Sequence, residues 1–479
     1  MLFNSFAFVV FLPLVFAAYW LLSKRPRLQN LLVIVVSYLF YGWWDWRFLL
    51  LIAFTSAWSY VAGLIELKRW DKKPSRLVLA SSLIVNLGIL GVFKYYNFFA
   101  DQFSVILAQF GFKVNMPSLS IILPVGISFY TFQALSYTID VYRRKLYPSR
   151  APLAFFAFIS FFPQLVAGPI ERATNLLPQF LSSRRFDYAQ AVLGCRQMLW
   201  GFFKKMVVAD NCAAVADHFL NMDGLTNGAA IWIGVFMFAL QIYGDFSGYS
   251  DIAIGCSRLF GINLMRNFAF PYFSRDIAEF WRRWHISLTT WFRDYLYIPL
   301  GGSRCSHLKQ IRNTFVIFLV SGLWHGANWT FILWGAFHAC LFIPLLLMKR
   351  NRKYLSSVVA EDRALPRIGD IGRMALTFFM ATIGWAIFRA QSASECFSWL
   401  MNMATPWSFA SVGKIPREFA FALASILILL SVEWFNRRKE FGFERLPAKK
   451  WMRWGLYYLV LIAITYGAPG SETFVYFQF

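Results

Sequence analysis

Long apolar runs recur from one end of this chain to the other. Runs of about 17–25 residues are each long enough to cross a hydrocarbon layer of about 30 Å as an α-helix. Backbone polar groups must be satisfied inside a bilayer, and the ten-residue strand rhythm of a closed barrel is missing from the sequence. Only 15% of the residues are charged, against about 25% in soluble proteins. The sequence therefore predicts an all-α polytopic integral membrane protein.

The basic residues lie in short clusters between the apolar runs, and they account for a net charge of +23. Lys24–Arg27, Lys68–Arg76 and Arg143–Lys145 alternate with loops that contain almost no Lys or Arg. Under the positive-inside rule, this order predicts cytoplasmic basic loops and an extracytoplasmic N-terminus. We expect no nucleic-acid partner, because the sequence has no soluble basic domain. The first apolar run lacks a basic segment ahead of it, so we expect a retained helix rather than a cleaved signal peptide.

The first 150 residues contain five predicted spans. Pro124 and Gly126 interrupt the fifth span, and a kink is the simpler interpretation than a broken helix. Phe155–Ile170 is short and contains Pro, which favours a re-entrant or interfacial segment. The five predicted spans are Asn4–Leu22, Leu31–Trp44, Phe48–Leu67, Leu77–Ala100 and Leu119–Val141.

Two carboxylates, Asp245 and Asp251, lie in the long apolar run Ala229–Ile262. Carboxylates are costly at membrane depth unless they face a cavity or a partner. We expect an unwound segment that lines a polar cavity, with Asp245 and Ser247 contacting substrate. The alternative is structural pairing of each Asp with an Arg further along the chain, such as Arg258 or Arg266.

The character of the sequence changes from Ser274 to Gly302, where charged residues alternate with aromatic residues at helical spacing. This stretch is too charged to span a membrane. It predicts amphipathic helices at the cytoplasmic interface, one of which carries His285.

A second imidazole, His325, lies in Ser321–Trp329, inside a run that is otherwise apolar. A titratable group at membrane depth indicates a functional site, although a buried histidine bonded to a carbonyl is the plain alternative. Gly322 and Gly326 leave room beside the ring for a substrate or a closely packed helix. His338 follows thirteen residues later, about 140° away around a single helix, and we interpret it as structural.

Three motifs, Phe280–Leu288, Arg293–Gly302 and Ser321–Gly326, resemble those of the membrane-bound O-acyltransferase (MBOAT) superfamily. The resemblance is greatest to the bacterial branch that O-acetylates exported polysaccharides, and it extends to Phe162–Ile170 and Gly244–Asp251. It implies one MBOAT transmembrane domain over residues 1–479, with about eleven spans plus re-entrant or interfacial helices.

The resemblance divides that domain into three sections. Residues 1–150 would form the N-terminal spans, 151–348 the catalytic core and 349–479 the C-terminal spans. Funnels from the two membrane faces would meet near the midplane of the bilayer.

The resemblance also implies an activity. The chain would be a multi-pass protein of the bacterial inner membrane that passes acetyl from cytoplasmic acetyl-CoA to an extracytoplasmic polysaccharide, such as alginate or peptidoglycan. Acetyl-CoA would be the donor, with no permanently bound cofactor and no metal. Because the extracytoplasmic loops are too short to bind a polymer, we expect a periplasmic transferase partner resembling SGNH hydrolases. We expect membrane lipids to be a further partner, because they surround a multi-pass protein.

The family resemblance matches His325 to the invariant catalytic histidine and His285 to the second histidine of the site. Acetyl transfer from a thioester to a hydroxyl needs a base and donors for the oxyanion, and a neutral imidazole suits the first task. We expect His325 to be the general base, and His285 to orient the donor or to stabilise the oxyanion. Pocket residues would be Trp324, Asn328 and Trp329, together with Asp245 and Ser247.

The C-terminal stretch Phe474–Gln478 resembles the tails that carry acyl groups in related D-alanylation and acetylation systems. Basic residues in the preceding loop predict that the tail ends outside the cytoplasm. One hypothesis is that Tyr476 receives acetyl through His325 and passes it to the partner. The alternative is an aromatic anchor at the membrane interface. A transporter, or a family member that acylates a lipid or a protein, is the rival function.

Overall fold

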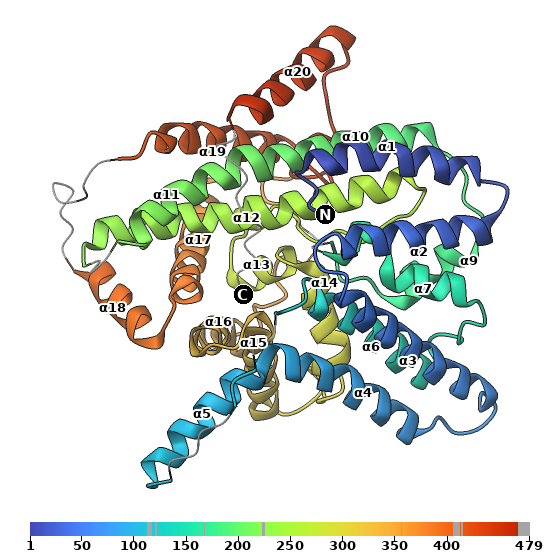
Figure 1. Cartoon of the computed structure of the whole chain (residues 1–479). Helices are drawn as coiled ribbons and strands as arrows, with labels where there is room; N and C mark the ends of the chain where they lie inside the picture. Colours follow the sequence, from blue (N-terminus) through green and yellow to red (C-terminus); the bar gives the residue numbers. More distant parts are fainter. Residues whose placement is uncertain are drawn as a thin grey trace. The chain divides into compact units, whose positions relative to one another are not determined.

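The computed structural model describes residues 1–112, 117–119, 122–166, 168–222, 226–355, 357–405, 412 and 415–467. Within these residues all regular secondary structure is helical, as predicted (Figure 1). The chain forms two compact units, which are described separately. The first consists of Met1–Gln190 and Ser257–Leu264, and the second of Ala191–Cys256 and Met265–Phe479.

Helices of the first unit are α1 (Phe6–Leu21), α2 (Pro26–Gly42), α3 (Phe48–Lys68), α4 (Arg76–Leu90), η1 (Gly91–Tyr95), α5 (Tyr96–Gln109), α6 (Ile127–Tyr142), α7 (Pro152–Ser160), α8 (Phe162–Leu165) and α9 (Ala173–Leu181). In this unit, α1 and α3 match the predicted spans within two residues at both ends, whereas α2 starts five residues before the predicted Leu31 and the rod formed by α4, η1 and α5 ends nine residues after the predicted Ala100.

The fifth predicted span is wrong at its beginning, because α6 starts only at Ile127. Gly126 precedes α6 with a φ of 76°, a left-handed conformation that glycine adopts without strain. A Cβ atom at this position would lie 2.3 Å from the carbonyl oxygen of Leu165. The break therefore serves a close backbone approach and is not a kink within one helix. Helices α7 and α8 are both too short to span a membrane, and the re-entrant or interfacial placement of this segment stays a prediction.

The second unit holds the longest helix and all residues of the candidate site. Its helices are α10 (Tyr188–Phe202, which begins in the first unit), η2 (Phe203–Ala209), α11 (Asp210–Leu220), α12 (Gly228–Leu259), η3 (Pro271–Phe273), α13 (Ile277–Arg283), α14 (Ile286–Phe292), η4 (Arg293–Tyr297), α15 (His307–His325), α16 (Trp329–Leu347), α17 (Ile368–Arg389), α18 (Ala393–Ala404), α19 (Glu418–Phe435) and α20 (Lys450–Gly467).

Six helices in the described part are long and apolar enough to cross a membrane, which makes this a multi-pass membrane protein. They are α3, the continuous rod α4–η1–α5, α12, α16, α17 and α19. The residues of α12 are mostly buried inside the protein, whereas those of the α4–α5 rod are mostly exposed. Side chains of that rod therefore suit contact with lipid.

The predicted unwound segment in α12 is also wrong, because the helix continues without interruption through Asp245 and Asp251. Glycines explain why it can stay helical while it packs closely on α10 and η2 (Figure 1). A Cβ atom on Gly248 would lie 2.8 Å from the carbonyl oxygen of Gly201. Small residues at such crossings let two helix backbones approach each other.

Helices α13 and α14 turn their aromatic side into the second unit, and their predicted place at the cytoplasmic interface stays a prediction. Phe280 and Trp284 are each only 1% exposed. Glu279 is fully buried, and its carboxylate bonds to Arg275 at 3.0 Å and Arg283 at 2.8 Å. The buried charge of Glu279 is thus balanced by two arginines.

The apolar run around His325 forms a hairpin of two antiparallel helices, α15 and α16, joined by residues 326–328. Gly322 faces the backbone of Phe331, and Gly335 faces that of Phe318, at the points of closest approach. The angle argument that separated His338 from His325 assumed a single helix and is therefore wrong. The hairpin brings both histidines into one aromatic cluster.

Candidate active site

His325 is the last residue of α15 and is 6% exposed. Its ring makes edge-on contacts with three aromatic rings from α15, α16 and α17. The centroid distances are 5.0 Å to Trp324, 5.2 Å to Trp334 and 5.2 Å to Phe388. His338 lies 5.0 Å from the same Trp334 ring. Rings from three helices thus hold the imidazole of His325 in one orientation.

His285 occupies the residue before α14 and has a φ of 44°, a left-handed conformation that is costly for a residue with a Cβ. Asn267 holds this turn. Its carbonyl oxygen accepts a bond from the backbone N–H of Ile286 at 2.9 Å. Its side-chain oxygen accepts from the backbone N–H and the hydroxyl of Ser287, at 3.3 and 2.9 Å. Such strain is typical of functional sites.

The same contacts decide the tautomer of His285. A backbone N–H can only donate, so the bond from Ser287 identifies the atom of Asn267 beside it as the amide oxygen. This oxygen lies 3.1 Å from Nδ1 of His285, so Nδ1 carries the proton and donates. Nε2 is then left with a lone pair, and it is buried without a hydrogen-bond partner among the described residues.

Charge on His285 is disfavoured by its surroundings. The residue lies outside the candidate spans and is 1% exposed, and burial lowers its pKa to about 3. Phe246 packs edge-on against its ring at a centroid distance of 4.6 Å. At neutral pH, His285 is therefore a neutral hydrogen-bond acceptor through Nε2.

Trp324 connects the two imidazoles. Its ring centroid lies 5.9 Å from that of His285 and 5.0 Å from that of His325. The sequence predicted that these histidines, forty residues apart, meet in one site, and the structure brings both against one buried indole. Trp324 is 4% exposed.

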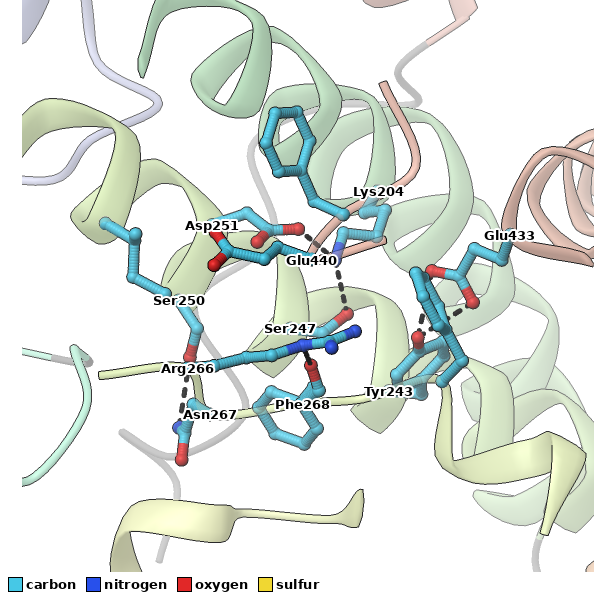
Figure 2. A pocket seen from close by; sticks show the side chains of 13 residues that line it. Lys204, Tyr243, Ser247, Ser250, Asp251, Arg266, Asn267, Phe268, Glu433 and Glu440 are labelled. Carbon is cyan, nitrogen blue, oxygen red and sulfur yellow. Dashed lines mark hydrogen bonds and ion pairs between the residues drawn. The ribbon is translucent and has the colours of Figure 1, made fainter. Parts of the chain in front are cut away.

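A small polar pocket is lined by residues of α12, η2, α19 and the segment that follows α12 (Figure 2). Lys204 donates to the carboxylate of Asp251 at 2.6 Å and to the hydroxyl of Ser247 at 2.9 Å. Asn267 lines this pocket and donates to Ser250 at 3.1 Å. Because Asn267 also contacts His285, the pocket and the imidazole belong to one hydrogen-bond network.

Lysines form the closest ion pairs given for the two aspartates of α12. Asp245 lies 2.9 Å from Lys205, which also contacts Asp210 at 2.8 Å. Arg266 lines the pocket, but its Nε donates to the carbonyl of Phe268 at 2.6 Å. The buried charges are thus balanced across the contact between η2 and α12.

Sequence reasoning missed three groups in this network: Asn267, the Lys204–Lys205 pair and Glu433. The hydroxyl of Tyr243 donates to both carboxylate oxygens of Glu433, at 2.9 and 2.8 Å, and both residues line the pocket. Two adjacent lysines inside an apolar run were a usable signal, because such charges need partners. Asn267 had no signal in the sequence.

The other predicted pocket residues occupy different places. Asn328 accepts from the backbone N–H of Thr330, which caps α16, and donates to the carbonyl of Gln391 at 2.7 Å. Trp329 is 49% exposed. Tyr476 lies outside the described residues. Within the described part, no three His, Cys, Asp or Glu side chains are placed to hold a metal ion.

The structure is thus a helical membrane protein with two buried imidazoles, each packed against aromatic rings. Residues 148–381 match the model of the membrane-bound O-acyltransferase family, MBOAT. The relatives below establish membership over most of the chain, so this protein belongs to the MBOAT family and is an O-acyltransferase.

The relatives include proteins that act on polysaccharides. The probable alginate O-acetylase AlgI of Pseudomonas putida is 38% identical over 443 residues, which cover 91% of this chain and 88% of the relative. AlgI of Pseudomonas aeruginosa is 42% identical over 399 residues, covering 82% and 72%. The peptidoglycan O-acetyltransferase of Helicobacter pylori is 34% identical over 433 residues, covering 84% and 80%.

Proposed function

We propose that this O-acyltransferase takes acetyl from cytoplasmic acetyl-CoA and passes it across the inner membrane, where an extracytoplasmic polysaccharide is O-acetylated. Alginate and peptidoglycan are the candidate polymers, because the relatives above are named for them. One observation carries the proposal: the imidazoles of His325 and His285 meet on Trp324 in the interior of a membrane protein.

His325 is the general base in this proposal. Its imidazole takes the proton of an acceptor hydroxyl while the hydroxyl oxygen attacks the thioester carbonyl. The tetrahedral intermediate then expels the CoA thiolate, which takes the proton back from the imidazolium. The three rings around His325 restrict its orientation, so the imidazole is positioned before the reaction begins.

His285 has the orienting role rather than the oxyanion role. A neutral ring whose Nδ1 proton bonds to Asn267 offers only a lone pair at Nε2, and an oxyanion needs a donor. Nε2 therefore accepts from an N–H or O–H group of a substrate. We propose that Trp324 and Ser247 line the substrate path and that Asp245 supports it through Lys205. Asn328 and Trp329 would contact the substrate from the turn that follows His325.

We also propose how the chain crosses the membrane. We infer one MBOAT domain with about eleven spans and both termini outside the cytoplasm, which accords with the loop charges. Tyr476 would carry acetyl outward to a periplasmic transferase that resembles SGNH hydrolases. A separate transferase is needed because the extracytoplasmic loops are too short to bind a polymer.

The test of His325 uses purified protein and acetyl-CoA. His325→Ala should abolish transfer of acetyl to an acceptor, and with it the release of CoA, at an unchanged yield of folded protein. His338→Gln is the matched control, because His338 is buried in the same aromatic cluster and has no proposed role. Equal loss in both variants would show that packing of the cluster, and not base chemistry at His325, limits activity. Full activity of His325→Ala would refute the proposal.

Tyr476 is tested in cells. Tyr476→Phe retains the aromatic ring of an interface anchor and removes the nucleophilic oxygen. If Tyr476 carries acetyl, this variant leaves surface polysaccharide unacetylated while the protein is present in the membrane at the wild-type amount. Acetylation at the normal level would show that the residue is an anchor.

A further inference from the structure

An open groove of about 590 Å³ lies in the first unit, beside the end of α1 and the loop before α10. The side chains that line this groove carry a net positive charge. Three basic side chains line it together with three aromatic rings and one hydroxyl, and no acidic residue is among them. The lining residues are Phe16, Trp20, Ser23, Lys24, Arg184, Arg185 and Phe186.

No carboxylate in the described part of the chain forms an ion pair with Arg184. The residue is 5% exposed, and among the described residues its side chain donates to neutral oxygens, including those of Asn30 at 2.7 Å and Gln29 at 3.2 Å. Burial lowers its pKa, which shows that the charged form is under-solvated. Its guanidinium lies 5.5 Å from the ring centroid of Tyr19. A buried cation of this kind favours an anion nearby.

Lys24 and Arg185 extend the positive charge to the exposed rim of the groove. Neither forms an ion pair with a described carboxylate. The acidic residue of the same loop, Asp187, forms hydrogen bonds to the backbone instead. Its carboxylate accepts from the backbone N–H groups of Ala189 and Gln190, at 2.8 and 3.1 Å. The groove therefore presents two accessible cations in front of a third, buried one.

The aromatic side of the groove is rigid. Phe186 packs on Trp20 at a centroid distance of 5.3 Å and on Phe16 at 6.0 Å. The indole N–H of Trp20 donates to the carbonyl of Leu259 at 3.0 Å. Val9, Phe16 and Trp20 are spaced by seven and four residues, so they form one row along α1. Val9 is 61% exposed, and this row continues the groove onto the apolar outer face of α1.

We propose that this groove is a binding site for an anionic phospholipid. The phosphate lies between Lys24 and Arg185, with the charge of Arg184 behind it, and one acyl chain follows the Val9–Phe16–Trp20 row. Charge at the end of a membrane helix and apolar surface along it match the two parts of such a lipid. A soluble phosphate would use only the basic rim and leave the aromatic row empty.

The experiment measures lipid retention by the full-length protein in detergent, using native mass spectrometry with added phosphatidylglycerol or phosphatidylcholine. Wild type should retain phosphatidylglycerol preferentially. The double variant Lys24→Gln/Arg185→Gln should lower its affinity about thirty-fold, since each basic residue near an anionic headgroup contributes about 1 kcal/mol. Phe16→Ser should weaken lipid binding without removing any charge.

The matched control is Arg25→Gln/Arg27→Gln, which removes the same charge from two exposed neighbours that do not line the groove. Equal loss in both double variants would overturn the site in favour of general charge attraction. Inorganic phosphate and CoA are added as competitors at matched concentrations. If either displaces the lipid from wild type and binds Phe16→Ser as tightly as wild type, the site holds a soluble phosphate compound and the proposal fails.

Discussion

Asn267 should control both the orientation and the protonation of His285. Asn267→Ala removes the acceptor for three groups: Nδ1–H of His285, and the hydroxyl and backbone N–H of Ser287. Each buried donor left unsatisfied costs about 1–3 kcal/mol, and the three costs are not additive because one atom serves all of them. We expect a net loss of about 3 kcal/mol in the free energy of unfolding.

The effect on catalysis should exceed what lost stability explains. Without Asn267, the proton of His285 can move to Nε2, and the left-handed turn at this residue loses its support. Loss of a residue that orients a functional imidazole typically costs about 10–100-fold in activity, or about 1.4–2.8 kcal/mol. The measurement is the rate of acetyl transfer from acetyl-CoA per folded molecule, with folding followed by thermal unfolding in detergent.

A second substitution separates positioning from packing. Asn267→Asp keeps an acceptor for His285 and Ser287 but adds a negative charge 3.1 Å from the ring. A nearby carboxylate raises the pKa of His285 from about 3 by about one unit or more. The acid limb of the pH–rate profile should therefore move to higher pH, while the rate at alkaline pH stays closer to wild type than that of Asn267→Ala.

The control is Asn86→Ala, which removes a buried amide from the first unit, where it bonds to Ser82 at 2.8 Å. It should lower stability and leave the pH–rate profile unchanged. Wild-type rate and profile in folded Asn267→Ala would refute the reasoning. If His285→Ala is fully active as well, the error lies in the role of His285 and not in its tautomer.

Three further predictions concern packing, charge and pH. Gly322→Val should lower the unfolding temperature and inactivate the enzyme, because its Cβ would lie 2.1 Å from a backbone oxygen of α16, whereas Gly88→Ala has open space and should be neutral or stabilising. Lys204→Met should cost about 1–3 kcal/mol, because it removes the ion-pair partner of the partly buried carboxylate of Asp251, and adding Asp251→Leu should recover part of this loss in denaturant unfolding. The unfolded state protonates His285 below about pH 6.5, whereas the folded state does so only near pH 3. The free energy of unfolding should therefore fall as the pH falls between these values. His285→Gln should reduce the slope of that free energy against pH by about 1.4 kcal/mol per pH unit.

Several features of this protein follow from its sequence alone. The helical membrane class was predictable because backbone groups in a bilayer can be satisfied only within a helix or a closed barrel, and the apolar runs carry that requirement locally. The starts of α1 and α3 were predictable for the same reason. His325 and His285 could be selected as site residues because imidazoles are rare in apolar runs and because the surrounding motifs resemble those of a known family.

Other features required the tertiary structure, since they depend on residues far apart in the chain. The pairing of Lys204 with Asp251 arises where glycines let α12 approach η2, and no local pattern encodes such an approach. The break after His325 turns one apolar run into a hairpin and places His338 in the same aromatic cluster as His325. The tautomer of His285 depends on Asn267, which ordinary sequence patterns leave unmarked. Local periodicity determines which segments are helical, whereas long-range packing decides which polar groups meet.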